Sequence, residues 1–88
     1  MRQAVLSTRF KKDLKRLSRQ RRPLAELDKI LTLLLNDEPI PEMYKDHMLI
    51  GNWMGYRELH ISPDFLLIYK KTWNFLRLAA VGSYSEIF

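Results

Sequence analysis

An α+β fold, with helices packed on one face of an antiparallel sheet, is predicted by two features of the chain. Apolar residues recur at helical spacing in the first half, whereas the second half consists of short alternating or apolar runs separated by turn residues. The 88 residues, of which 47% are hydrophobic, suffice for one domain spanning residues 1–88. The expected order of elements is β-α-α-β-β-β, with a further short strand around residues 48–50.

The first half predicts a strand followed by two helices. Residues 3–6 form a short apolar run, and either Ser7 or Thr8 can cap the helix that follows through its side-chain oxygen. Over residues 8–20 apolar side chains recur at helical spacing among basic ones, which is typical of an amphipathic helix. Pro23 suits the first turn of a second helix, which ends at residues 36–39. The two helices should form a hairpin whose apolar stripes face the sheet.

The second half predicts the strands of that sheet. Residues 56–62 alternate, which places Glu58 and His60 on one face of a strand and Arg57 on the other face with two aliphatic side chains. Turn residues at 62–64 separate this strand from β-rich runs at 65–70 and 73–81. Three antiparallel strands in a meander follow.

Basic residues are concentrated before Pro23. That segment contains nine of the 15 lysines and arginines but only one acidic residue, Asp13, so its net charge is +8, whereas that of the remainder is −3. A polyanion or an acidic partner should therefore meet the N-terminal segment first. A nucleic acid, an acidic peptide and a solvated helix face are all compatible with this charge.

Several classes of protein are excluded by composition. The chain has no cysteine, which rules out a disulfide scaffold, a thiolate metal site and a cysteine nucleophile. Its longest apolar runs fall far short of the roughly 18 residues that a membrane span needs, and its first residues lack a signal-peptide pattern. We therefore expect a cytoplasmic protein with no membrane partner.

Two histidines lie among carboxylates in the sequence. Asp46 precedes His47, and Glu58 and Asp64 lie near His60. Histidine can accept and donate a proton near neutral pH, as cleavage of RNA through its own 2′-hydroxyl requires. Ordinary surface histidines, or a metal site formed with these carboxylates, are alternative interpretations, although the spacing matches no tight metal-ligand motif. Asp64, which follows a proline, can equally be a turn residue.

Three stretches of the second half resemble the YafQ branch of the RelE/ParE toxin superfamily. They are residues 44–47, with the sequence Tyr-Lys-Asp-His, and the runs 51–61 and 63–69. The resemblance is dense over residues 44–88 and less diagnostic before them. Members of this family are small bacterial toxins of type II toxin–antitoxin systems that cut messenger RNA, usually in the ribosomal A site.

The resemblance implies a RelE-like fold and an endoribonuclease that inhibits translation and needs neither a metal nor another cofactor. Its partners would be the ribosome with its mRNA and an acidic antitoxin that wraps the toxin, and operator DNA would be bound only through the antitoxin complex. The family's catalytic positions fall on His47, His60 and Asp64, with Glu58 as the acid two residues before the strand histidine. Phe88 matches the aromatic residue that ends the family's tail.

Two family positions differ in this chain. Ala80 and Tyr84 stand where many relatives have an arginine and a catalytic histidine. Because a phenol is mostly protonated at neutral pH, Tyr84 is expected to act as an acid or a phosphate partner, while His47 or His60 acts as the base. The alternative is a catalytically weakened member that acts as an antitoxin-binding or nucleic-acid-binding module. The gyrase-directed ParE branch is disfavoured by the two histidines.

Basic residues and one aromatic residue are candidates for contacts with RNA. Those near the catalytic positions are expected to hold the substrate, although Arg57 can instead form a salt bridge at the edge of the core. Those of the N-terminal segment are expected to bind ribosomal RNA. Most aromatic side chains should pack in the core rather than stack on bases. The RNA-binding candidates are Lys45, Arg57, Arg77 and Phe88, together with Arg16, Arg19, Arg21 and Arg22.

Overall fold

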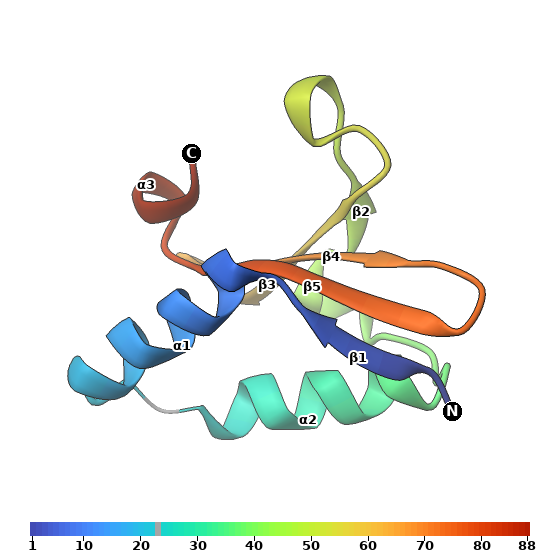
Figure 1. Ribbon diagram of the computed structural model, residues 1–88, viewed down its shortest axis with the longest axis horizontal. Helices are drawn as coiled ribbons and strands as arrows, with labels where there is room; N and C mark the ends of the chain where they lie inside the picture. Colours follow the sequence, from blue (N-terminus) through green and yellow to red (C-terminus); the bar gives the residue numbers. More distant parts are fainter. Residues whose placement is uncertain (23) are drawn as a thin grey trace.

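The computed structural model describes residues 1–22 and 24–88, which form a five-stranded sheet with helices on both faces (Figure 1). The strands are β1 (Gln3–Leu6), β2 (His47–Met48), β3 (Arg57–Ser62), β4 (Phe65–Lys71) and β5 (Phe75–Gly82), in the spatial order β1-β5-β4-β3-β2. The helices are α1 (Thr8–Arg19), α2 (Ala25–Leu35) and α3 (Tyr84–Ile87), with short 3₁₀ helices η1 (Glu42–Tyr44) and η2 (Gly51–Trp53). None of the helices in the described residues has both the length and the apolar character needed to cross a membrane.

The sheet is mixed rather than purely antiparallel. β1 runs parallel to β5, with Gln3 opposite Phe75, whereas every other neighbouring pair is antiparallel. The α+β class is confirmed, but the prediction of an antiparallel sheet is wrong for β1. Hydrophobic alternation identifies a strand without specifying its partner, and a parallel partner can lie far along the chain because it is reached through a crossover.

The predicted helix hairpin is confirmed. α1 packs against β5 and α2 against β3, and Figure 1 shows both helices on the same side of the sheet. Ser7 begins α1 as its N-cap, because its hydroxyl accepts a hydrogen bond of 2.9 Å from the Phe10 N–H. Phe10 and Leu17 of α1 and Ile30 of α2 are buried in the main core between the hairpin and the sheet. Pro23, expected in the first turn of the second helix, lies outside the described residues.

The opposite face of the sheet carries a smaller apolar cluster. Leu66, Ile68 and Ala80 project from β4 and β5, and they are covered by Ile87 of α3 and partly by Trp53 of η2. Figure 1 shows α3 and the loop that contains η2 rising on this side of the sheet, away from α1 and α2. This second face carries most of the predicted catalytic residues.

Candidate active site

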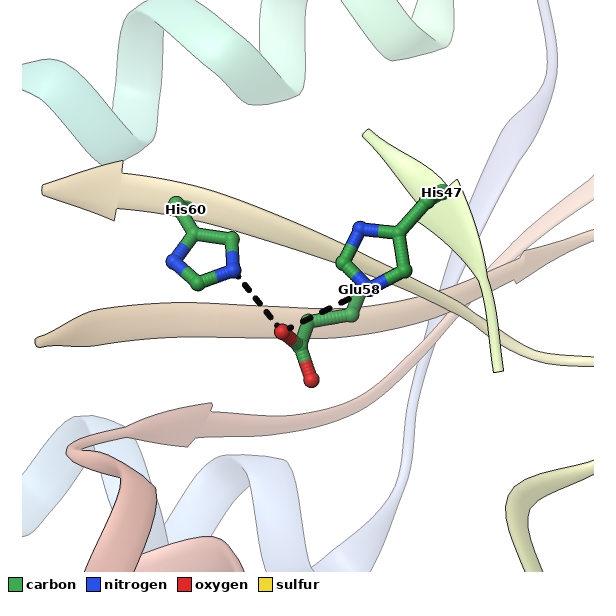
Figure 2. A group of neighbouring side chains, drawn as sticks. All are labelled: His47, Glu58 and His60. Carbon is green, nitrogen blue, oxygen red and sulfur yellow. Dashed lines mark ion pairs between the residues drawn. The ribbon is translucent and has the colours of Figure 1, made fainter. Parts of the chain in front are cut away.

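His47, Glu58 and His60 form a cluster on the sheet face that α3 and η2 cover (Figure 2). His47 lies opposite Glu58 in the β2–β3 pair, and strand alternation places His60 on the same face. His60 Nε2 lies 2.9 Å from Glu58 Oε1, and His47 Nε2 lies 3.7 Å from the same oxygen. The two imidazole rings are stacked, with centroids 6.0 Å apart. The structure thus brings together three of the five predicted catalytic residues.

Glu58 is a buried carboxylate, because only 7% of the residue is exposed. A carboxylate removed from water needs hydrogen-bonding or charged partners, and here the two imidazoles supply them. His47 Nδ1 lies 2.6 Å from the carbonyl oxygen of Lys45, which can only accept, so this nitrogen carries a proton. His60 Nε2 lies within ion-pair distance of Glu58 Oε1, which leaves Nδ1 as the imidazole nitrogen that does not face this carboxylate. His60 therefore has a buried carboxylate beside one of its two ring nitrogens.

Asp64 and Tyr84 meet at the end of the sheet beyond His60. Asp64 Oδ1 accepts a hydrogen bond of 3.0 Å from the backbone N–H of Tyr84, so Asp64 anchors the first residue of α3. The Tyr84 side chain is 62% exposed, and its ring centroid lies 5.0 Å from that of Phe88. His60 and Gly82 pair with the same residue of β4 from either side, which separates their backbones by about 10 Å. Tyr84, two residues after Gly82, therefore lies on the far side of β4 from the histidine cluster.

Aromatic side chains continue from α3 along this face. The ring of Trp53 lies 6.3 Å from Phe88 and 5.6 Å from Tyr56, in both cases edge to face. Lys70 Nζ lies 5.5 Å from the centroid of the Tyr56 ring. Arg77 is exposed and pairs with Lys70 across β4 and β5, which places both cations on this face. Phe88 and Arg77 thus both lie on the sheet face that carries the histidine cluster.

Ala80, at the position of the family's arginine, has no exposed surface and packs against the apolar side chains beneath α3. A methyl group here supplies no charge for phosphate. Among the described residues, Lys70 and Arg77 are the strand cations that the register places on this face.

Arg57 lies on the other face of the sheet, away from the histidine cluster. Its Nε lies 3.1 Å from Asp46 Oδ1, and the Tyr69 hydroxyl donates to the same oxygen at 2.6 Å. Burial and the Asp46 carboxylate raise the pKa of the Tyr69 phenol, so its proton stays in this network. Arg57 therefore forms a salt bridge at the edge of the core, as the alternative interpretation predicts. Its position does not support the expected contact with phosphate.

Arg16 is also held in a structural network. Its guanidinium lies 2.7 Å from Asp13 Oδ1 and 3.0 Å from Glu86 Oε2, and it donates to the Val81 carbonyl at 3.0 Å. Asp13 is almost fully buried and also accepts from the Val81 N–H at 3.0 Å. Arg16 therefore joins α1 to β5 and α3, so its expected contact with ribosomal RNA is not supported by its position.

The remaining basic candidates are on the surface. Arg19 and Arg21 are exposed at the end of α1, whereas the Arg22 guanidinium lies 4.5 Å from the centroid of the Phe65 ring. Lys45 is exposed and has a left-handed backbone conformation, with φ of 51°. Of these residues, Arg19 and Arg21 are the strongest candidates for the predicted contact with RNA, because both are exposed.

The helix α3 was not anticipated from the sequence. The Ser83 hydroxyl accepts from the Glu86 N–H at 3.3 Å, and Glu86 Oε1 accepts from the Ser83 N–H at 2.8 Å, which together make a capping box. The Ser-x-x-Glu spacing of residues 83–86 was the available signal. The fixed position of α3 is what places Tyr84 and Phe88 on the site face.

The histidine cluster also has a geometry suited to a metal ion. One ligand atom from each of His47, Glu58 and His60 lies within 4.8 Å of the others. Two imidazoles and a carboxylate are donors that zinc accepts, and imidazole also suits copper. A metal bound there would engage the Nε2 atoms that approach Glu58 and would occupy the Glu58 carboxylate.

Comparison with known proteins identifies the family. Residues 2–88 match the family described as the bacterial toxin of type II toxin–antitoxin systems, YafQ. The chain belongs to this family. The resemblance of residues 44–88 to the YafQ branch is therefore confirmed, and the match extends over the first half as well.

Individual relatives cover nearly the whole chain. The mRNA interferase toxin YafQ of Escherichia coli K12 is 40% identical over 83 residues, which are 93% of this chain and 90% of that protein. YafQ in the E. coli DinJ–YafQ complex matches with a TM-score of 0.91 and 38% identity over 100% of this chain and 99% of that one. A metal-bound toxin from Helicobacter pylori matches with a TM-score of 0.92 and 39% identity over 100% of both chains.

Proposed function

We propose that this chain is the toxin of a type II toxin–antitoxin system and that it inhibits translation by cutting mRNA as an endoribonuclease. The cluster of His47, Glu58 and His60 is the observation that carries this proposal. It combines two groups that exchange protons near neutral pH with a buried carboxylate that orients them. The name of the E. coli relative, an mRNA interferase, supports the same substrate class.

Cleavage follows the chemistry of RNA's own 2′-hydroxyl. Nδ1 of His60 removes the 2′-proton, the 2′-oxygen attacks the adjacent phosphorus, and the bond to the leaving 5′-oxygen breaks. Glu58 stabilises the imidazolium that forms, as a carboxylate does behind a catalytic histidine. The Tyr84 phenol gives its proton to the leaving oxygen or to the phosphate, and His47, when protonated, supplies positive charge beside the reacting phosphate.

The proposed reaction needs no metal, because the base, the acid and the charge all come from side chains. Metal binding is a second property that the cluster supports, since its three donors lie within 4.8 Å of one another and a metal-bound H. pylori toxin has the same fold. Zinc or copper at the cluster would displace the 2.9 Å contact between His60 Nε2 and Glu58, so that Glu58 could no longer stabilise the imidazolium of His60. We expect such a metal to inhibit cleavage.

The proposed partners are the ribosome and a cognate antitoxin. We expect cleavage to occur in the ribosomal A site and to depend on the ribosome. Buried Ala80 replaces the family's arginine and cannot hold the phosphate, so ribosomal groups would orient it instead. The DinJ–YafQ complex supports an antitoxin partner, and the +8 segment before Pro23 suits an acidic one. Operator DNA would then be bound through the antitoxin.

The decisive experiment adds the purified chain to a translating reaction and maps new 5′ ends on the message by primer extension. Codon-spaced cuts should require ribosomes, should be absent from naked RNA, and should fall about 10²- to 10⁴-fold with His60→Ala. A chelator selective for transition metals should leave the cuts intact, and added zinc should reduce them. No cuts from folded, ribosome-bound protein would instead support the catalytically weakened binding module.

A further inference from the structure

A cavity of about 410 Å³ lies beside the histidine cluster, between η1 and the end of β3. Met43 and Lys45 line one wall, whereas His60, Ser62 and Pro63 line the other. Its volume falls within the range of roughly 300–1,000 Å³ that is usual for small-molecule sites. His60 is therefore both a member of the cluster and a wall of this cavity.

The outer edge of β3 is open where it borders the cavity. β2 pairs only with Arg57 and Glu58, so no strand among the described residues lies against this edge beyond Glu58. The Leu49 N–H donates to the Tyr56 carbonyl at 2.9 Å, so Tyr56 turns its carbonyl toward this edge, and strand alternation gives Glu58 and His60 the same direction before the register shift that follows His60. The peptide N–H and C=O of His60 follow this alternation and face outward without a strand partner.

The opposite wall offers apolar contact and positive charge. Met43 is 73% exposed although its side chain is apolar, and its flexible thioether is suited to packing on a flat ring. Lys45 beside it is exposed. A concave site that combines apolar contact, open peptide groups and a cation matches the way unstacked RNA bases are held, by packing on their faces and hydrogen bonds to their edges.

We propose that this cavity is a nucleobase subsite, which holds the base of one of the two nucleotides joined by the phosphodiester that is cut. The inference rests on the proposed function, because it takes His60 as the group that acts on the 2′-hydroxyl. A base in the cavity then belongs to a nucleotide directly at that phosphodiester. The subsite sets the sequence preference of cleavage, whereas the histidine cluster sets its rate.

Two methionines of nearly equal exposure provide a matched test. Met43→Ala removes a wall of the cavity, whereas Met54→Ala removes a side chain that is 74% exposed and lies outside the cavity. Cleavage sites of each variant are mapped by sequencing new 5′ ends on a message translated by ribosomes. Met43→Ala should reduce the ratio of cutting at preferred and disfavoured codons about tenfold. Met54→Ala should retain the parent distribution.

A second variant fills the cavity from its other wall. Ser62→Phe, at an exposed position, should raise KM more than it lowers kcat and should also change the distribution of cut codons. Circular dichroism and urea unfolding establish that each variant is folded. If the parent protein makes no cuts, the proposed function fails. If it cuts, and both Met43→Ala and Ser62→Phe retain its codon distribution, the subsite is overturned, and weakened antitoxin binding by the same variants would assign the cavity to the antitoxin.

Discussion

The phenol of Tyr84 exchanges protons differently from the imidazole that relatives have at this position. Tyr84→Phe keeps the ring, and with it the packing against Phe88 at 5.0 Å, but removes the hydroxyl. If the hydroxyl donates a proton to the leaving oxygen, single-turnover cleavage on programmed ribosomes should slow about 10²-fold, and Tyr84→His should recover much of the rate. An equal rate for Tyr84→Phe and the parent protein would remove Tyr84 from the mechanism.

Single residues differ in how far the sequence alone can assign them. Glu58 and His60 are two positions apart on one strand, so their shared face follows directly from alternation. Arg16 and Arg57 each have a partner outside their own element, since Glu86 is 70 residues from Arg16 and Asp46 is 11 residues from Arg57. The number of basic residues therefore predicts a basic surface, but in the folded protein Arg16 and Arg57 form salt bridges.

The element that depends most on tertiary contacts is α3. A helix of four residues is too short to be stable alone, since nucleation is costly and each added residue contributes little. It is held instead by its capping box, by the hydrogen bond from Tyr84 to Asp64 and by the ion pair between Arg16 and Glu86. The same dependence explains why periodicity did not reveal it, because four residues span little more than one helical turn.

Glu86 makes the stability of this element depend on pH. The hydrogen bond from the Ser83 backbone, with the Arg16 charge, lowers the pKa of the Glu86 carboxyl below its ordinary 4.5. Because the pKa of this carboxyl is lower in the native than in the unfolded protein, its ionised form stabilises the fold. This stabilisation is fully present at pH values above the unfolded-state pKa, and it is lost as the pH falls through the native-state pKa. Glu86→Gln should therefore reduce the free energy of unfolding by about 1 kcal/mol near neutral pH, and by less in acid.

Urea unfolding of the parent and of Glu86→Gln, at about pH 7 and about pH 3, measures this difference. Glu38→Gln is the matched control, because Glu38 is exposed on the loop after α2, and it should leave both free energies nearly unchanged. The same loss of stability for Glu86→Gln at both pH values would show that the charge of Glu86 contributes nothing.

The whole molecule is divided by its sheet into a structural side and a site side. The α1–α2 hairpin seals the main core on one face, while the opposite face is only partly covered, by α3 and η2 (Figure 1). The class of fold and the hairpin follow from hydrophobic periodicity, which is a local property. The parallel pairing of β1 with β5 joins the two ends of the chain, and no local pattern encodes such a pairing.

The uneven distribution of charge is a property of the whole molecule, and its positive N-terminal segment would attract the ribosome over a long range. Arg19 and Arg21 are exposed within the +8 segment, so the double variant Arg19→Gln and Arg21→Gln should weaken ribosome binding and lower its salt slope by about 1.5. The measurement is binding against salt concentration in a His60→Ala background, with Lys29→Gln on exposed α2 surface as the control. Cleavage chemistry in the parent background should persist once binding is saturated, because neither arginine is in the histidine cluster. A slope that does not change would mean that this basic end of α1 is only a solvated helix face, and that the cations which hold RNA are those of the site face, Lys70 and Arg77.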